Sequence, residues 1–73
     1  MKKEIVVEEV VFTPYLVNII EDEVVVYTNA RPTSKQVSVV RKNEVYTIIS
    51  EKNGYGKLKN GLGWIDLKAT QKL

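Results

Sequence analysis

The chain of 73 residues predicts a small all-β barrel, and three observations support that prediction. Valine, isoleucine and threonine account for 23 of the 73 residues, whereas alanine and leucine are few, and β-branched side chains favour strands. No stretch keeps an apolar period of 3.6 residues, as an amphipathic helix would. Two Asn-Gly pairs, at 53–54 and 60–61, bracket one short strand, and such pairs supply the positive φ angles of type I′ hairpin turns.

Residues 1–13 precede the predicted barrel, which spans residues 14–73. This first segment mixes charged residues with the apolar runs 5–7 and 10–12. Two interpretations are open: a linker from a larger parent protein, or an edge strand at a subunit contact, where its apolar side chains would be buried. Pro14 then separates the segment from the first barrel strand.

The barrel strands follow in order, each bounded by turn-forming residues. An acidic turn at 21–23 separates the first two strands, and a polar loop at 29–34 follows the second. Pro32 denies this loop a place in a central strand, because proline has no N–H to donate. The tail, residues 68–73, has room for a single helical turn. The expected strands are 15–20, 24–27, 37–40, 44–50, 55–59 and 62–67.

The residue types present argue against most catalytic chemistry. The chain has no cysteine and no histidine, which removes disulfides, thiolate zinc sites and the commonest general base. The consecutive acids at 21–23 read as a solvated turn, because glycoside hydrolysis needs two carboxylates held across a cleft. We therefore expect a binding domain with no cofactor and no metal. No apolar stretch has the length of a membrane span, and Glu8 and Glu9 interrupt any signal-peptide core.

Formal charge is distributed unevenly along the chain. Residues 1–30 carry a charge of −4, and residues 31–73 carry +6. The basic half suits a polyanion, either nucleic acid or an anionic wall polymer. The excess of basic residues also has an explanation that involves no ligand: they lie on solvated strand faces, or are lysines at sheet edges that block aggregation.

Residues 42–59 and 63–67 resemble the bacterial SH3 domain. They follow the family's order of a turn, a Val/Ile strand, an Asn-Gly-aromatic turn, a Lys-Leu-Lys strand and a Gly-Trp-Ile strand. The resemblance is especially close to the C-terminal SH3-type domains of phage endolysins and N-acetylmuramoyl-alanine amidases of Gram-positive hosts. It is clear over residues 36–73, moderate over 15–35 and absent over 1–13.

The chain departs from the family pattern in its first signature and near its end. Tyr27 takes the place of an arginine, and the glycine and proline of the family's first loop are missing. Tyr55 replaces the tryptophan of the Asn-Gly-Trp turn, and Ala69 stands where the family has a tyrosine. These changes affect the groove in which the family binds its ligand, and they leave the expected fold unaltered.

The resemblance implies an SH3-like barrel of five or six strands, with an extra N-terminal strand or linker. It implies a non-catalytic module that targets a phage endolysin or autolysin to the Gram-positive cell wall by binding peptidoglycan or an associated wall polymer. The parent protein would then be a peptidoglycan hydrolase with a catalytic domain. It would be made in the host cytoplasm without a signal peptide and would act at the wall after release. No membrane partner is expected. A product made apart from the catalytic domain would form a homo-oligomer through residues 1–13.

Five residues are candidates for ligand binding: Tyr27, Arg31, Lys35, Tyr55 and Trp64. Alternation along its strand turns Trp64 outward, where an aromatic ring offers a binding platform. Tyr55 follows a turn on the same meander, and Tyr27 borders the polar loop. Arg31 and Lys35 lie in that loop and suit the carboxylates of wall stem peptides. Each residue has a structural alternative, as packing for the rings and as a solvated loop for the cations.

Two other functions fit the same sequence. SH3-like barrels also bind nucleic acid, and the basic C-terminal half with its nearby aromatic residues is compatible with that function. The chain could instead serve as a protein-interaction or oligomerisation module that pairs through an exposed edge strand. Steep salt dependence would favour nucleic acid, because phosphate contacts weaken rapidly as salt rises.

Overall fold

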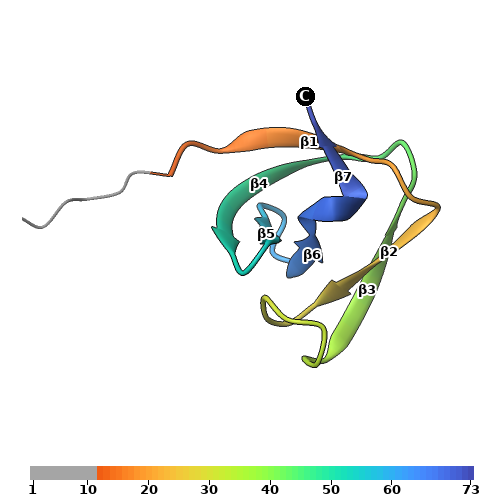
Figure 1. Ribbon diagram of the computed structural model, residues 1–73, viewed down its shortest axis with the longest axis vertical. Helices are drawn as coiled ribbons and strands as arrows, with labels where there is room; N and C mark the ends of the chain where they lie inside the picture. The colour runs from red at the N-terminus through yellow and green to blue at the C-terminus, as the bar shows by residue number, and fades with distance from the viewer. Residues whose placement is uncertain (1–11) are drawn as a thin grey trace, which may run out of the picture.

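The computed structural model describes residues 12–73, which form a single antiparallel sheet that curls around one core (Figure 1). The order of strands across the sheet is β3-β2-β6-β5-β4-β1-β7. The predicted all-β, barrel-like fold is confirmed. The elements are β1 (Tyr15–Ile19), β2 (Glu23–Tyr27), β3 (Gln36–Arg41), β4 (Val45–Lys52), β5 (Tyr55–Leu58), β6 (Trp64–Asp66), the 3₁₀ turn η1 (Leu67–Ala69) and β7 (Thr70–Lys72).

The core forms because alternate residues of each strand point inward. Val17 and Ile19 on β1 are fully buried, as are Val26 on β2 and Ile65 on β6. Each fully buried aliphatic side chain contributes about 1.5–3 kcal/mol relative to exposure. Among the described residues, the buried members of the core are Val17, Ile19, Val24, Val26, Val40, Ile48, Leu58, Ile65 and Ala69. In the described part of the chain, every buried side-chain nitrogen or oxygen has a hydrogen-bond partner.

The two Asn-Gly pairs adopt different conformations. Asn53 and Gly54 both have positive φ angles, of 55° and 81°, which confirms the predicted type I′ turn between β4 and β5. The same prediction for residues 60–61 is wrong, because Gly61 has a positive φ of 84° and Asn60 does not. Asn60 instead accepts a hydrogen bond from the Leu62 backbone N–H at 2.9 Å through its side chain. The longer loop that results delays β6 until Trp64.

The tail adds a strand that the sequence did not predict. Asp66 begins η1 by accepting a hydrogen bond from the Lys68 backbone N–H at 2.9 Å. The expected helical turn therefore exists, but it occupies residues 67–69 and not the whole tail. The chain then extends into β7, which pairs with β1, so residues 12–73 form seven strands where five or six were expected.

The expectation for residues 1–13 lies largely outside the described residues. Of that segment only residues 12 and 13 are described, and they belong to no strand. The Phe12 ring packs against Tyr15, with their centroids 6.0 Å apart. No helix among the described residues is long and apolar enough to cross a membrane.

Tyr15, the first residue of β1, is partly buried and packs against the core. Its hydroxyl donates a 2.5 Å hydrogen bond to the Glu51 carboxylate, and the Lys72 ammonium lies 4.5 Å from the centre of its ring. Burial raises the pKa of Tyr15 to about 12, and the Glu51 carboxylate adds to the shift because it favours the protonated phenol.

Candidate ligand-binding face

The outer side of strands β2, β6 and β5 carries three of the predicted site residues. Trp64 on β6 is the cross-strand partner of Tyr27 on β2 and of Lys57 on β5. Tyr55 on β5 is the partner of Asp66 on β6. Residues that face each other in an antiparallel pair have their side chains on the same side of the sheet. We call this surface the aromatic face; its members are Val25, Tyr27, Tyr55, Lys57, Trp64 and Asp66.

Alternation along each strand explains why these side chains point outward. Ile65, next to Trp64, is fully buried, and Gly56, next to Tyr55, is buried as well. Trp64 is half-buried. It therefore lies on the outer side of the sheet, as the sequence predicts, but it is partly covered by its neighbours.

Gly63 allows β2 and β6 to approach each other at the aromatic face. Its φ angle is 147°, and a side-chain carbon at this position would lie 2.3 Å from the Tyr27 carbonyl oxygen. No residue with a side chain fits so close to backbone. The glycine before Trp64 therefore sets the spacing between Trp64 and Tyr27.

The two tyrosine rings contact each other across β6. Their centroids are 6.1 Å apart and the ring planes meet at 79°, an edge-to-face arrangement that aromatic pairs favour. Burial raises the pKa of Tyr55, and the nearby Asp66 carboxylate and Tyr27 ring raise it further. Tyr55 therefore stays neutral at physiological pH and offers its hydroxyl for hydrogen bonding.

The loop between β2 and β3 folds back on itself beside Trp64. Its ends are joined by a hydrogen bond from the Thr28 backbone N–H to the Lys35 carbonyl at 2.9 Å. The Ser34 hydroxyl lies 2.7 Å from the Arg31 carbonyl oxygen, to which it donates. The Asn53 side-chain amide donates to the Ala30 carbonyl at 3.4 Å. The loop is thus joined to the hairpin turn between β4 and β5.

A hollow of about 140 Å³ lies between this loop, the hairpin turn and Trp64. We call it the loop hollow. Two cations and two side-chain amides line it together with Trp64, and none of its lining residues within 12–73 is acidic. Such a set of groups suits a carboxylate attached to an apolar or peptide body, because guanidinium and amide groups donate hydrogen bonds to it. The lining residues are Asn29, Ala30, Arg31, Lys52, Asn53 and Trp64.

A second hollow, of about 190 Å³, adjoins the first and has the opposite charge. We call it the tyrosine hollow, because Tyr27 and Tyr55 form part of its wall. Trp64 lines the loop hollow and Tyr27 lines the tyrosine hollow, and these two residues are cross-strand partners in the β2–β6 pair. Of the acids here, Glu23 forms an ion pair with Arg41. The charged lining residues are Glu21, Glu23, Asp66 and Lys68.

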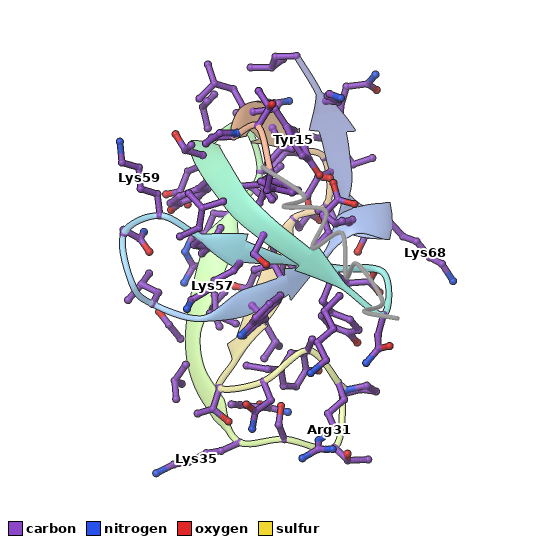
Figure 2. All side chains as sticks on the ribbon, turned by 90° about the vertical axis from the view of Figure 1, so that its left-hand side faces the viewer. Tyr15, Arg31, Lys35, Lys57, Lys59 and Lys68 are labelled. Carbon is purple, nitrogen blue, oxygen red and sulfur yellow. The ribbon has the colours of Figure 1, made fainter. Side chains whose placement is uncertain are left out.

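The structure therefore brings together four of the five predicted site residues. Tyr27, Tyr55 and Trp64 share the aromatic face, and Arg31 lines the loop hollow beside Trp64. Lys35 lines neither hollow, and Figure 2 shows its side chain extending from the opposite side of the loop to that of Arg31.

Sequence reasoning did not identify Asn29, Lys52 and Asn53 as lining residues. Asn53 was explained by its turn backbone, which its positive φ supports, yet its side chain also joins the loop to the turn. The available signal was the position of Lys52 and Asn53 directly before Gly54 and Tyr55 in a tight hairpin. A tight turn places its own residues close to those of the strand that follows.

No group of three or more potential metal ligands of the His, Cys, Asp and Glu types occurs within residues 12–73. No protein-family model, no curated protein and no solved structure matches this chain. The function must therefore be inferred from the residues and the geometry of the aromatic face.

Proposed function

We propose that the chain is a non-catalytic module that binds the Gram-positive cell wall through the aromatic face and the loop hollow. The observation that carries this proposal is the position of Trp64, whose indole forms one wall of a hollow that also holds Arg31 and Lys52. A wall stem peptide offers matching chemistry, namely a peptide backbone for the aromatic surface and a carboxylate for the cations. The resemblance of residues 36–73 to bacterial SH3 domains supports the same ligand.

In this proposal the module performs no chemistry of its own. It would hold a peptidoglycan hydrolase, the parent endolysin or autolysin, on the wall after release from the host. The ligand would lie along the aromatic face with its carboxylate in the loop hollow. The Tyr27–Tyr55 pair would support the ligand backbone, because rigid rings bury area at little entropic cost.

The direct test is co-sedimentation of the full chain with purified Gram-positive sacculi, before and after removal of wall teichoic acid. We expect the protein to pellet with both preparations, since the proposed ligand is the peptide part of the wall. Pelleting only before removal would identify an anionic polymer as the ligand. Absence of pelleting with both would overturn the proposal.

Nucleic acid is the second candidate ligand, favoured by Lys57, which faces Trp64 across the β5–β6 pair. An indole beside cations is the arrangement that stacks bases and neutralises phosphates. Lys57 lies over the face formed by β4, β5 and β6 in Figure 2. Titration with a single-stranded oligonucleotide at two salt concentrations separates the candidates, because affinity from phosphate contacts falls steeply between about 50 and 200 mM salt.

A further inference from the structure

Strand β3 leaves one edge of the sheet open. It pairs only with β2, and it ends the order of strands across the sheet in the described part of the chain. Its six residues contain no proline and no lysine, although natural proteins commonly protect an edge with those residues. The backbone N–H and C=O groups on its outer edge are therefore available to another strand.

The side chains of β3 also favour the addition of a strand. Val37 and Val39 point outward and are 45% and 42% exposed. Val39 lies opposite the half-buried Val25 on β2. These valines form an apolar strip beside the open edge, and an added strand would bury part of it.

Charge determines what kind of strand fits this edge. Lys35 precedes β3, Arg41 ends it and Lys42 follows it. If two copies of β3 paired with each other in antiparallel fashion, the basic start of one would face the basic end of the other. Like charges directly opposite each other destabilise a strand pair. An acidic, β-branched strand avoids that repulsion.

Residues 4–11 have these properties in their sequence, Glu-Ile-Val-Val-Glu-Glu-Val-Val. They lie outside the described residues and provide eight positions for a six-residue edge. We propose that residues 4–11 of a second copy of this chain add to the open edge of β3 as an extra strand. The same exchange between further copies would produce a homo-oligomer.

A second copy fits better than the chain's own segment. Figure 1 shows the beginning of the described chain, before β1, on one side of the barrel and β3 on the other. To reach β3 of its own barrel, the acidic segment would have to cross from one side of the barrel to the other. The segment of a second copy can reach β3 directly. The inference does not depend on wall binding, because the added strand pairs with the outer edge of β3; of the apolar strip, Val25 is the residue that also lines the tyrosine hollow.

The test is the oligomeric state of the full 73-residue chain, measured by sedimentation equilibrium over a range of concentrations. We expect association of the unmodified protein and a dissociation constant raised at least about tenfold in Val37→Lys/Val39→Lys, because the lysines remove the apolar strip that the added strand would bury, and lysine is a residue with which natural sheets block edge pairing. The matched control is Val45→Lys, which changes an equally exposed valine (50%) on β4, a strand paired on both sides. The control should associate normally.

Charge reversal identifies the donor segment. Glu8→Lys/Glu9→Lys and Lys35→Glu/Lys42→Glu should each weaken self-association, and an equimolar mixture of the two variants should associate again, since the basic segment of one meets the acidic edge of the other. Four results would each overturn the proposal: a monomer at every concentration, equal weakening by Val45→Lys, normal association of Glu8→Lys/Glu9→Lys, or no association in the mixture. Circular dichroism of each variant distinguishes loss of association from loss of folding.

Discussion

The loop hollow and the tyrosine hollow are neighbours on one face, yet they carry opposite charge. Arg31 and Lys52 line the first, whereas Glu21, Glu23 and Asp66 line the second. The strands between them supply mainly aromatic and aliphatic surface. The charges lie at strand ends and in the segments beside them: Arg31 is in the loop after β2 and Glu21 in the acidic turn, whereas Lys52 ends β4, Glu23 begins β2 and Asp66 ends β6. The strands therefore set the position of the rings, and the strand ends together with the adjoining loops set the charge of the ligand that each hollow can accept.

Gly63→Ala should have the largest effect on stability, because it disrupts the close approach of β2 and β6 that places Tyr27 beside Trp64. The added carbon would lie 2.3 Å from the Tyr27 carbonyl oxygen at a positive φ, and we expect a loss of about 3 kcal/mol in the free energy of unfolding. Urea denaturation measures the loss. Gly61→Ala is the matched control, since Gly61 also has a positive φ but faces open space; it should cost only about 1 kcal/mol. Equal losses would contradict the close approach of β2 and β6.

Among the substitutions that leave the barrel folded, Trp64→Ala should weaken wall binding the most. It removes the indole wall of the loop hollow, and buried aromatic anchors commonly contribute about 2 kcal/mol or more to binding, a factor of roughly thirty. Co-sedimentation with sacculi measures the change, and Leu16→Ala, which alters an exposed side chain on β1, is the control. Unchanged binding in Trp64→Ala would move the site away from the loop hollow.

A comparison of Arg31→Ala with Lys35→Ala tests whether the loop hollow binds a carboxylate. Both residues are exposed cations of one loop, but only Arg31 lines the hollow. A charge-assisted hydrogen bond contributes about 1.5 kcal/mol, so we expect Arg31→Ala to weaken wall binding about tenfold. Lys35→Ala should change it less than about twofold. Equal weakening by both would indicate attraction by net charge and would favour an anionic polymer.

Asp66→Asn should have the smallest effect, and of the two hollows it concerns only the tyrosine hollow. Burial is the main cause of the raised pKa of Tyr55, and the Asp66 charge adds to it. The substitution should therefore lower the pKa of Tyr55 but leave it above the ordinary value. Asparagine still caps η1, so the fold should persist.

An ultraviolet absorbance titration of the tyrosines measures this change. Tyr15 serves as the internal control, because burial and the Glu51 carboxylate raise its pKa to about 12 and Asp66 does not contribute. A shift in Tyr15 alone would contradict the assignment. The pKa of each tyrosine is higher in the folded protein than its ordinary value of 10.0. The stabilisation that results should therefore be fully present below about pH 10 and should be lost as pH rises through the folded pKa values.

The fold was predictable because local signals were strong and agreed with one another. The β-branched composition, the turn at Asn53 and the alternation around Ile65 all indicate a sheet with Trp64 on its outer side. Residues 53–54 and 60–61 are both Asn-Gly, but the second pair could not be predicted from the first. At the second pair the Asn60 side chain accepts a hydrogen bond from the Leu62 N–H, which closes a longer loop. Tertiary pairing, in this case with β1, also decides that residues 70–72 extend.

The candidate site was partly predictable for a related reason. Tyr27, Tyr55 and Trp64 occupy strand positions, where period-two alternation fixes the face to which each belongs. Arg31 and Lys35 lie in a loop, where no periodicity indicates direction, and only one of them lines the hollow. Lys52 was missed because its position depends on how the loop after β2 meets the hairpin turn. That meeting is a long-range contact, seen in the hydrogen bond from Asn53 to Ala30.

The single tryptophan of the chain stands in the wall of the loop hollow. Its intrinsic fluorescence therefore reports on that hollow without a label. A ligand that covers the half-buried indole should shift its emission to shorter wavelength, whereas unfolding should shift it to longer wavelength as water reaches the ring. One spectrum thus distinguishes an occupied hollow from a lost fold, and wall fragments can be compared by titration in solution before any sacculus is used.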